Sequence, residues 1–278
     1  MKADDFTATP DDLLASAIRF GEHLTGSGWR VRIEPFDLAY PRMPVFVATR
    51  EHTTTIVEVQ SSVDVGVIEE WTRYAGACGK DTRVLVAVGG GGGVGVGADV
   101  LERLRGFGVG LLLVGADGPY EVLPPKDLAL KLELPEVPEK LRPILGHAYD
   151  LFDRGEWREG FEHACTRFEQ ESRKYLRARV SRGGVTFISA AGSPKTYALT
   201  RIGKMTLGQL AEAFGEMRSP NLIDSRLGQC LKEVNPERVT AAHYKGTAAA
   251  REKKLRGAVA RHMFIVVNGL CYAKGISR

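Results

Sequence analysis

Residues 45–59 read VFVATREHTTTIVEV and predict two β-strands joined by a tight turn. The runs 45–49 and 53–59 are rich in Val, Ile and Thr, whose branched side chains favour extended backbone. The charged residues at 50–52 mark the turn between them. These two strands predict a β-sheet in the first half of the chain. The second half has almost no strand patterns, so the two halves are expected to differ in fold.

Helical and strand patterns alternate on both sides of this pair. The helical segments carry apolar residues three or four positions apart, and the later strands are short apolar runs, typical of strands covered on both faces. The predicted order is helix 10–24, strands 29–34, 45–49 and 53–59, helix 65–77, strand 83–88, helix 98–107 and strand 110–114. We therefore predict an α/β domain over residues 1–122.

The segment 123–141 is predicted to be a linker because its four prolines interrupt regular structure. Helical patterns dominate beyond it. They predict one or two helices over 142–179 and further helices at 207–217, 222–234 and about 247–272, with Thr206 as an N-cap and 185–189 as a candidate short strand. We expect residues 142–278 to form a second, all-α domain.

Charge differs between the two halves. Residues 1–138 contain 13 Lys and Arg against 20 Asp and Glu, whereas residues 139–278 contain 25 against 14. The basic half is where a polyanion such as nucleic acid is expected to bind. No apolar run reaches membrane-spanning length, and the acidic N-terminal residues are the opposite of a signal peptide, so we expect a cytoplasmic protein. The four cysteines lack zinc-ligand spacing, and neither a metal nor a cofactor is predicted.

The first half resembles the PD-(D/E)xK restriction-endonuclease-like fold in its order of elements and in residues 42–48 (RMPVFVA) and 56–60 (IVEVQ). That family places an Asp after the Pro and E-x-K on the next strand; the carboxylates hold a divalent metal and the Lys orients the attacking water. Here Val45 stands at the Asp position and Gln60 at the Lys position, which leaves Glu58 alone. The resemblance implies a nuclease-like domain with a degenerate site. A metal-dependent DNase that uses Glu58 is one alternative.

The second half carries a different chemistry at residues 235–243, NPERVTAAH. Arg238 is permanently charged, and His243 titrates near neutral pH. An Arg that stabilises a phosphate and a His that moves a proton can cleave an RNA backbone without a metal. The pair is predicted to lie at the start of the last long helix, after a helix that ends at Val234.

Three segments of this half resemble HEPN domains, the helical bundles of RNA-cleaving toxins and defence proteins. They are residues 146–169, 205–210 and 235–243. The resemblance implies that Arg238 and His243 form the R-x-x-x-x-H catalytic pair and that Tyr244 and Lys245 contact RNA. It also implies a homodimer through the helical domain, and an antitoxin or defence-system partner.

Other interpretations stay open. Arg256 and His262, six positions apart, form a second-choice pair with compatible spacing. Arg238 could instead pair with Glu233 or Glu237 and have no role in catalysis. The leading function is a metal-independent endoribonuclease. The main alternative is a non-catalytic nucleic-acid-binding or regulatory assembly protein in which both nuclease sites are degenerate.

Overall fold

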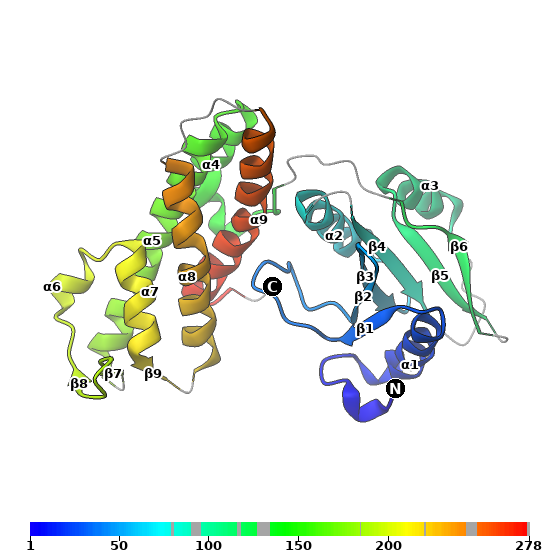
Figure 1. Ribbon diagram of the computed structural model, residues 1–278, viewed down its shortest axis with the longest axis horizontal. Helices are drawn as coiled ribbons and strands as arrows, with labels where there is room; N and C mark the ends of the chain where they lie inside the picture. Colours follow the sequence, from blue (N-terminus) through cyan, green and yellow to red (C-terminus); the bar gives the residue numbers. More distant parts are fainter. Residues whose placement is uncertain are drawn as a thin grey trace. The chain divides into compact units, whose positions relative to one another are not determined.

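A computed structural model describes residues 1–78, 81–89, 96–115, 118–126, 134–183, 185–219, 221–242 and 249–276, and for 249–254 it describes the backbone alone. The chain divides into two compact units, Met1–Leu134 and Pro135–Arg278 (Figure 1). The boundary falls inside the proline-rich segment 123–141. The predicted combination of an α/β first part and a mainly helical second part is confirmed.

The first unit is built on a mixed six-stranded sheet with strand order β1-β2-β3-β4-β5-β6. Strands β3, β4 and β5 are parallel, and the other neighbours are antiparallel. Its elements are η1 (Ala3–Asp5), α1 (Asp11–Gly26), β1 (Arg30–Ile33), β2 (Phe46–Arg50), β3 (Thr53–Gln60), α2 (Val65–Cys78), β4 (Thr82–Val88), α3 (Ala98–Phe107), β5 (Gly110–Gly115) and β6 (Gly118–Leu123). The eight predicted elements are confirmed in order, with ends within two residues. The structure also contains the edge strand β6, which was not predicted because it begins with Gly118 and Pro119, residue types that are depleted in strands.

The pleat of β3 assigns the two faces of this sheet. Val57 and Val59 pack with Phe20 of α1 in one apolar cluster. Glu58 lies between them in sequence and therefore points to the opposite face, where Trp71 of α2 contacts it. Figure 1 shows α1 on one side of the sheet and α2 and α3 on the other. A buried strand thus places a carboxylate beneath a helix.

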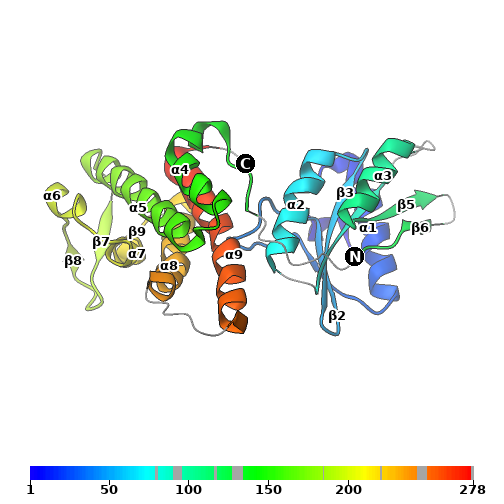
Figure 2. The ribbon, with the colours of Figure 1, turned by 90° about the horizontal axis from the view of Figure 1, so that it is seen from above.

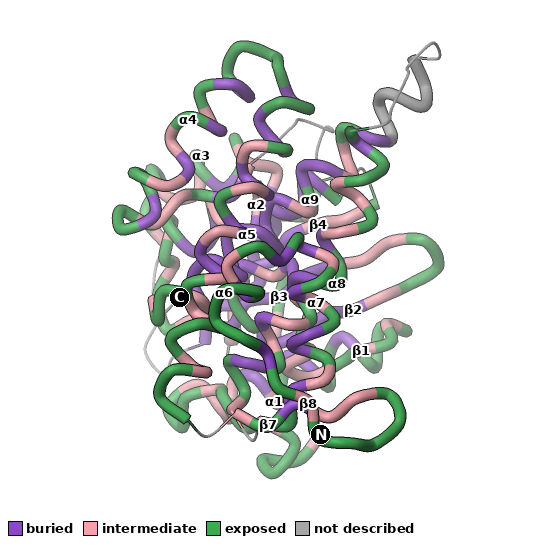
Figure 3. The backbone as a smooth tube through the Cα atoms, turned by 90° about the vertical axis from the view of Figure 1, so that its left-hand side faces the viewer, coloured by how far each residue is buried: buried purple, intermediate pink, exposed green. Residues whose placement is uncertain are grey.

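The second unit is a helical bundle. Its elements are η2 (Glu139–Leu141), α4 (Arg142–Asp153), α5 (Trp157–Ser181), β7 (Thr186–Ile188), β8 (Pro194–Lys195), α6 (Leu199–Ile202), α7 (Leu207–Glu216), β9 (Met217–Arg218), α8 (Leu222–Ala242) and α9 (Ala249–Lys274). Helix α5 packs against α4, α7, α8 and α9. Buried and exposed positions alternate along the helices, as expected for amphipathic helices (Figure 3). The predicted cap is confirmed: Thr206 and Gln209 form a capping box at α7.

Two expectations for this unit are wrong. It is not all-α, because β7 pairs with β8 and β9 in a small antiparallel sheet (Figure 2). The candidate strand at 185–189 is confirmed as β7, whereas β8 and β9 have two residues each, too few for a periodic pattern. Helix α8 does not end at Val234 but continues through Pro236 to Ala242. Pro236 removes one helical hydrogen bond, and packing of α8 against its neighbours compensates for this loss.

No helix in the described parts of the chain is long and apolar enough to cross a membrane.

Candidate functional site

Arg238 lies on the last turns of α8, not at the start of the final helix as predicted. Its Nη1 donates a hydrogen bond to Oε2 of Glu169, on α5, at 3.1 Å. The expected partners Glu233 and Glu237 are replaced by a carboxylate 69 positions away in sequence. The side chain of Arg238 keeps 28% of its surface exposed. Arg238 is therefore anchored by one end and remains accessible to solvent.

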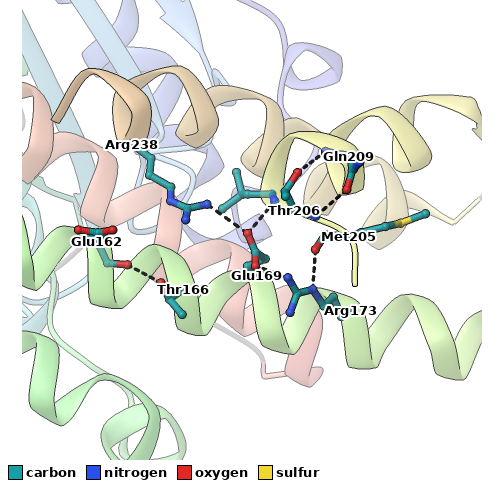
Figure 4. A network of polar contacts seen from close by, with 9 residues as sticks. Glu162, Thr166, Glu169, Arg173, Met205, Thr206, Gln209 and Arg238 are labelled. Atoms are coloured by element: carbon teal, nitrogen blue, oxygen red, sulfur yellow. Dashed lines mark hydrogen bonds and ion pairs between the residues drawn. The ribbon is translucent and has the colours of Figure 1, made fainter. Parts of the chain in front are cut away.

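Glu169 is the centre of this arrangement (Figure 4). It is buried, with 8% of its surface exposed, and accepts hydrogen bonds from three donors. These are the backbone N–H of Leu207 at 2.7 Å, the guanidinium of Arg173 and the guanidinium of Arg238. Arg173 also donates from Nε to the backbone oxygen of Met205 at 2.5 Å. One carboxylate thus joins α5, α8 and the start of α7, as a buried charge requires.

The guanidinium groups of Arg173 and Arg238 share the carboxylate of Glu169, and a second carboxylate, Glu162, belongs to the same network (Figure 4). Of the five N–H donors of Arg238, one bonds to a side chain in the described part of the chain. Its remaining donors suit a planar oxyanion such as a phosphate. Val239, which follows it, is half exposed. Glu169 holds Arg238 in place without saturating it.

The structure does not describe the predicted partner of Arg238 or the two predicted RNA-contacting residues. His243, Tyr244 and Lys245 lie outside the described residues. The structure therefore describes Arg238 and its anchor but not its predicted catalytic partner.

The second-choice pair is described on α9. The Nδ1 of His262 lies 2.7 Å from the backbone oxygen of Ala258, one turn earlier, and the ring is partly buried. Arg256 is exposed, and its Cζ lies over the ring of Trp157, 5.7 Å from the ring centroid. Six residues on an α-helix correspond to faces about 120° apart, so the two side chains leave the helix in different directions. The structure gives them separate partners.

In the first unit, Val45, Glu58 and Gln60 line one cavity. Glu58 is 7% exposed, and the indole N–H of Trp71 donates to its Oε1. Gln60 accepts a hydrogen bond from the backbone N–H of Asp64 at 2.8 Å. Gln60 therefore shapes the loop before α2 and supplies no positive charge at the position where the family has Lys.

Burial raises the pKa of Glu58 to about 7. The hydrogen bond from Trp71 and the charge of Arg42 oppose this rise, and the charge of Glu70 adds to it. In the described ranges, no three His, Cys, Asp or Glu side chains gather closely enough to hold a metal ion. A hard divalent metal needs several oxygen ligands, and Glu58 alone does not provide them.

Sequence reasoning assigned no role to Glu169 or Glu34. The spacing of Glu169 and Arg173, four apart on one helix, was a signal for an ion pair, but nothing local linked either to Arg238. Glu34 follows β1 and lines the same cavity as Glu58. It has a left-handed backbone (φ 42°), and its carboxylate accepts the backbone N–H groups of Thr7, Ala8 and Thr9.

Comparison with protein-family models, curated proteins and solved structures finds no match.

Proposed function

We propose that this protein is a metal-independent endoribonuclease in which Arg238 binds the scissile phosphate and His243 transfers the proton. The observation that supports the proposal is the anchoring of Arg238 by Glu169. An Arg fixed at one end loses less conformational freedom when it binds a phosphate, and its other donors remain open. The excess of Lys and Arg in the second half favours a polyanionic substrate.

The chemistry needs no further group. The 2′-oxygen of RNA attacks the adjacent phosphorus as His243 accepts its proton. Arg238 stabilises the charge on the non-bridging oxygens. The bond from phosphorus to the 5′-oxygen breaks, and that oxygen takes up a proton from solvent water, which leaves a 2′,3′-cyclic phosphate and a 5′-hydroxyl. DNA lacks the attacking hydroxyl, so selectivity for RNA follows without base contacts. A homodimer that joins two such sites, and a role in toxin or antiviral systems, belong to the same proposal.

The ion pair with Glu169 also favours a second candidate function. Because the carboxylate already compensates part of the charge of Arg238, the cluster could hold the bundle together while the basic unit binds nucleic acid without cleaving it. Both functions predict RNA binding, and only the first predicts cleavage.

Incubation of purified full-length protein with a defined RNA in excess EDTA separates these functions. The endoribonuclease predicts cleavage in EDTA, ending in cyclic phosphates and blocked by a single 2′-deoxy substitution at the cut site. His243→Ala is expected to lower the rate roughly 10² to 10⁴-fold, the usual contribution of a general base. His52→Ala, an exposed His in the first unit, is the matched control and should leave the rate unchanged.

Two further variants complete the test. Arg238→Ala should reduce cleavage, and Glu169→Gln, which loosens the anchor but keeps the guanidinium, should reduce it less. RNA binding with no cleavage by the wild type would support the non-catalytic function. Cleavage of DNA that requires Mg²⁺ and disappears in Glu58→Ala would instead support a metal-dependent DNase.

A further inference from the structure

A cavity of about 490 Å³ lies wholly within the first unit, at the end of β3 where α2 begins. Its wall comes from chain segments 8–13, 42–45 and 58–67 and from residue 34. Its size is that of pockets that hold small organic ligands. The proposed RNA chemistry does not use it.

The side chains that line this cavity carry more negative than positive charge. Glu34, Glu58 and Asp64 are acidic, and Arg42 is the basic side chain of the lining. Arg42 is paired with Glu70 at 3.3 Å, which compensates its charge. An anionic ligand would therefore meet net repulsion, whereas a cation would be attracted.

Two of the three carboxylates already have their hydrogen-bond partners. Glu34 accepts from Thr7, Ala8 and Thr9 in the segment that forms one wall, at 2.7 to 3.0 Å. Asp64 accepts from the backbone N–H groups of the first turn of α2, at 2.9 and 3.2 Å. Glu34 accepts at both of its oxygens, and Asp64 accepts at Oδ1 alone but is exposed, where water competes with a ligand for its other oxygen.

Glu58 differs from both. It is 7% exposed, and Trp71 donates to its Oε1 alone. Within the described residues, its Oε2 has no hydrogen-bond donor. A buried carboxylate that lines a cavity and has one open oxygen is a binding point for a donor that enters the cavity. Apolar side chains of the same wall, Leu13, Val45 and Val67, offer contact to the rest of a ligand.

We propose that this cavity binds a small organic cation whose amidinium, guanidinium or ammonium group pairs with Glu58 and whose apolar body contacts Leu13, Val45 and Val67. A divalent metal is disfavoured, because the described acidic side chains do not gather into a ligand set. A cation with its own N–H donors needs only the one open carboxylate oxygen, and the charge-assisted hydrogen bond then supplies the specificity. The proposal is independent of the ribonuclease function.

Three probes of one shape and different charge test this inference. Benzamidine, benzamide and benzoate share a ring and carry a cationic, a neutral and an anionic head. The titrations use full-length ¹⁵N-labelled protein at pH 8, and the indole N–H signals give the dissociation constants. The chain has three tryptophans, so the signal of Trp71, which donates to Glu58, is readily assigned with a Trp71→Phe sample.

Benzamidine is expected to shift the Trp71 signal and to bind at least about tenfold more tightly than benzamide, the usual effect of a charge-assisted hydrogen bond. Benzoate should produce no shift. Glu58→Gln keeps the size of the side chain and should reduce benzamidine to the affinity of benzamide. Glu102→Gln, an exposed carboxylate of α3 outside the cavity, is the matched control and should bind as the wild type does.

A second variant checks the location without altering charge. Ser62→Trp, at an exposed position of the wall, should obstruct the cavity and weaken benzamidine binding. Equal affinity for the three probes, preference for benzoate, unchanged binding in Glu58→Gln, or no shift with any probe would each overturn the proposal. A shift of the Trp71 signal by Mg²⁺ alone that is lost in Glu58→Gln would replace it with a metal site.

Discussion

Substitution of Glu58 by Gln should stabilise the first unit at alkaline pH but not at acidic pH. Gln has nearly the same size as Glu and can still accept the hydrogen bond from the indole of Trp71. It removes the charge that the buried position disfavours. The effect of the substitution on stability should therefore follow the ionisation of Glu58.

The sign and size of this effect on the free energy of unfolding follow from the shift in the pKa of Glu58. Burial raises the pKa of Glu58 from 4.5 to about 7, so the folded state holds a proton that the unfolded state releases. In the wild type, the contribution of Glu58 to the free energy of unfolding is fully present below pH 4.5 and is lost as the pH rises through 7. The shift corresponds to about 3 kcal/mol at full ionisation, because one pKa unit is about 1.4 kcal/mol. The advantage of Glu58→Gln over the wild type should thus be about 3 kcal/mol larger at pH 8 than at pH 4.5.

Urea unfolding of the full-length chain, followed by hydrogen exchange of peptides from β3 and β4, measures the free energy of unfolding of this unit. Glu102→Gln, which removes an exposed carboxylate of α3, serves as the matched control. A difference between Glu58→Gln and the wild type that is constant between pH 4.5 and pH 8, or that grows toward acidic pH, would refute a raised pKa for Glu58.

Three further perturbations test the packing and the caps. Thr206→Ala removes the capping box of α7 and should lower the free energy of unfolding of the second unit by about 1 kcal/mol in urea; no loss would show that the cap is not needed. Gly269→Ala would place a Cβ 2.4 Å from the ring of Phe168 and should destabilise the bundle in thermal unfolding. Gly257→Ala on the same helix meets open space and should be neutral or stabilising. Equal effects of the two substitutions would contradict the close approach of Gly269 to Phe168. Burial alone would raise the pKa of Glu34, but the hydrogen bonds from Thr7, Ala8 and Thr9 together outweigh it and lower the pKa to about 2. The stability that Glu34 contributes is therefore present above pH 4.5 and is lost as the pH falls toward 2. Urea unfolding of Glu34→Gln should therefore approach the wild type at acidic pH, and a deficit that persists there would contradict this role.

Local patterns predicted most of the backbone. Strands such as β3 and β4 were found because their apolar β-branched residues fit a buried sheet, and α7 was found because Thr206 caps it. The wrong prediction for the end of α8 has a tertiary cause. Helix α8 was expected to end before Pro236 because propensity disfavours proline there, but packing in the bundle outweighs one lost hydrogen bond.

The candidate sites were predicted less completely. The sequence identified Arg238 and Glu58 as chemically interesting residues. It did not predict that Glu169 holds Arg238, because no local pattern links positions on two different helices. It did not predict the cavity at Glu58 either, since the wall combines four parts of the chain that only the fold brings together.

The sequence by itself determined most of the order of helices and strands, the acidic and basic halves, and the identities of Val45 and Gln60 near Glu58. These features depend on residue type and on spacing over a few positions, which the chain carries directly. Only the tertiary structure decided the environment of each charge: an anchored and partly exposed guanidinium at Arg238, and a buried carboxylate with a raised pKa at Glu58. The physical reason is that burial, hydrogen bonding and ion pairing depend on which distant segments meet, and these meetings set what each ionisable group can do.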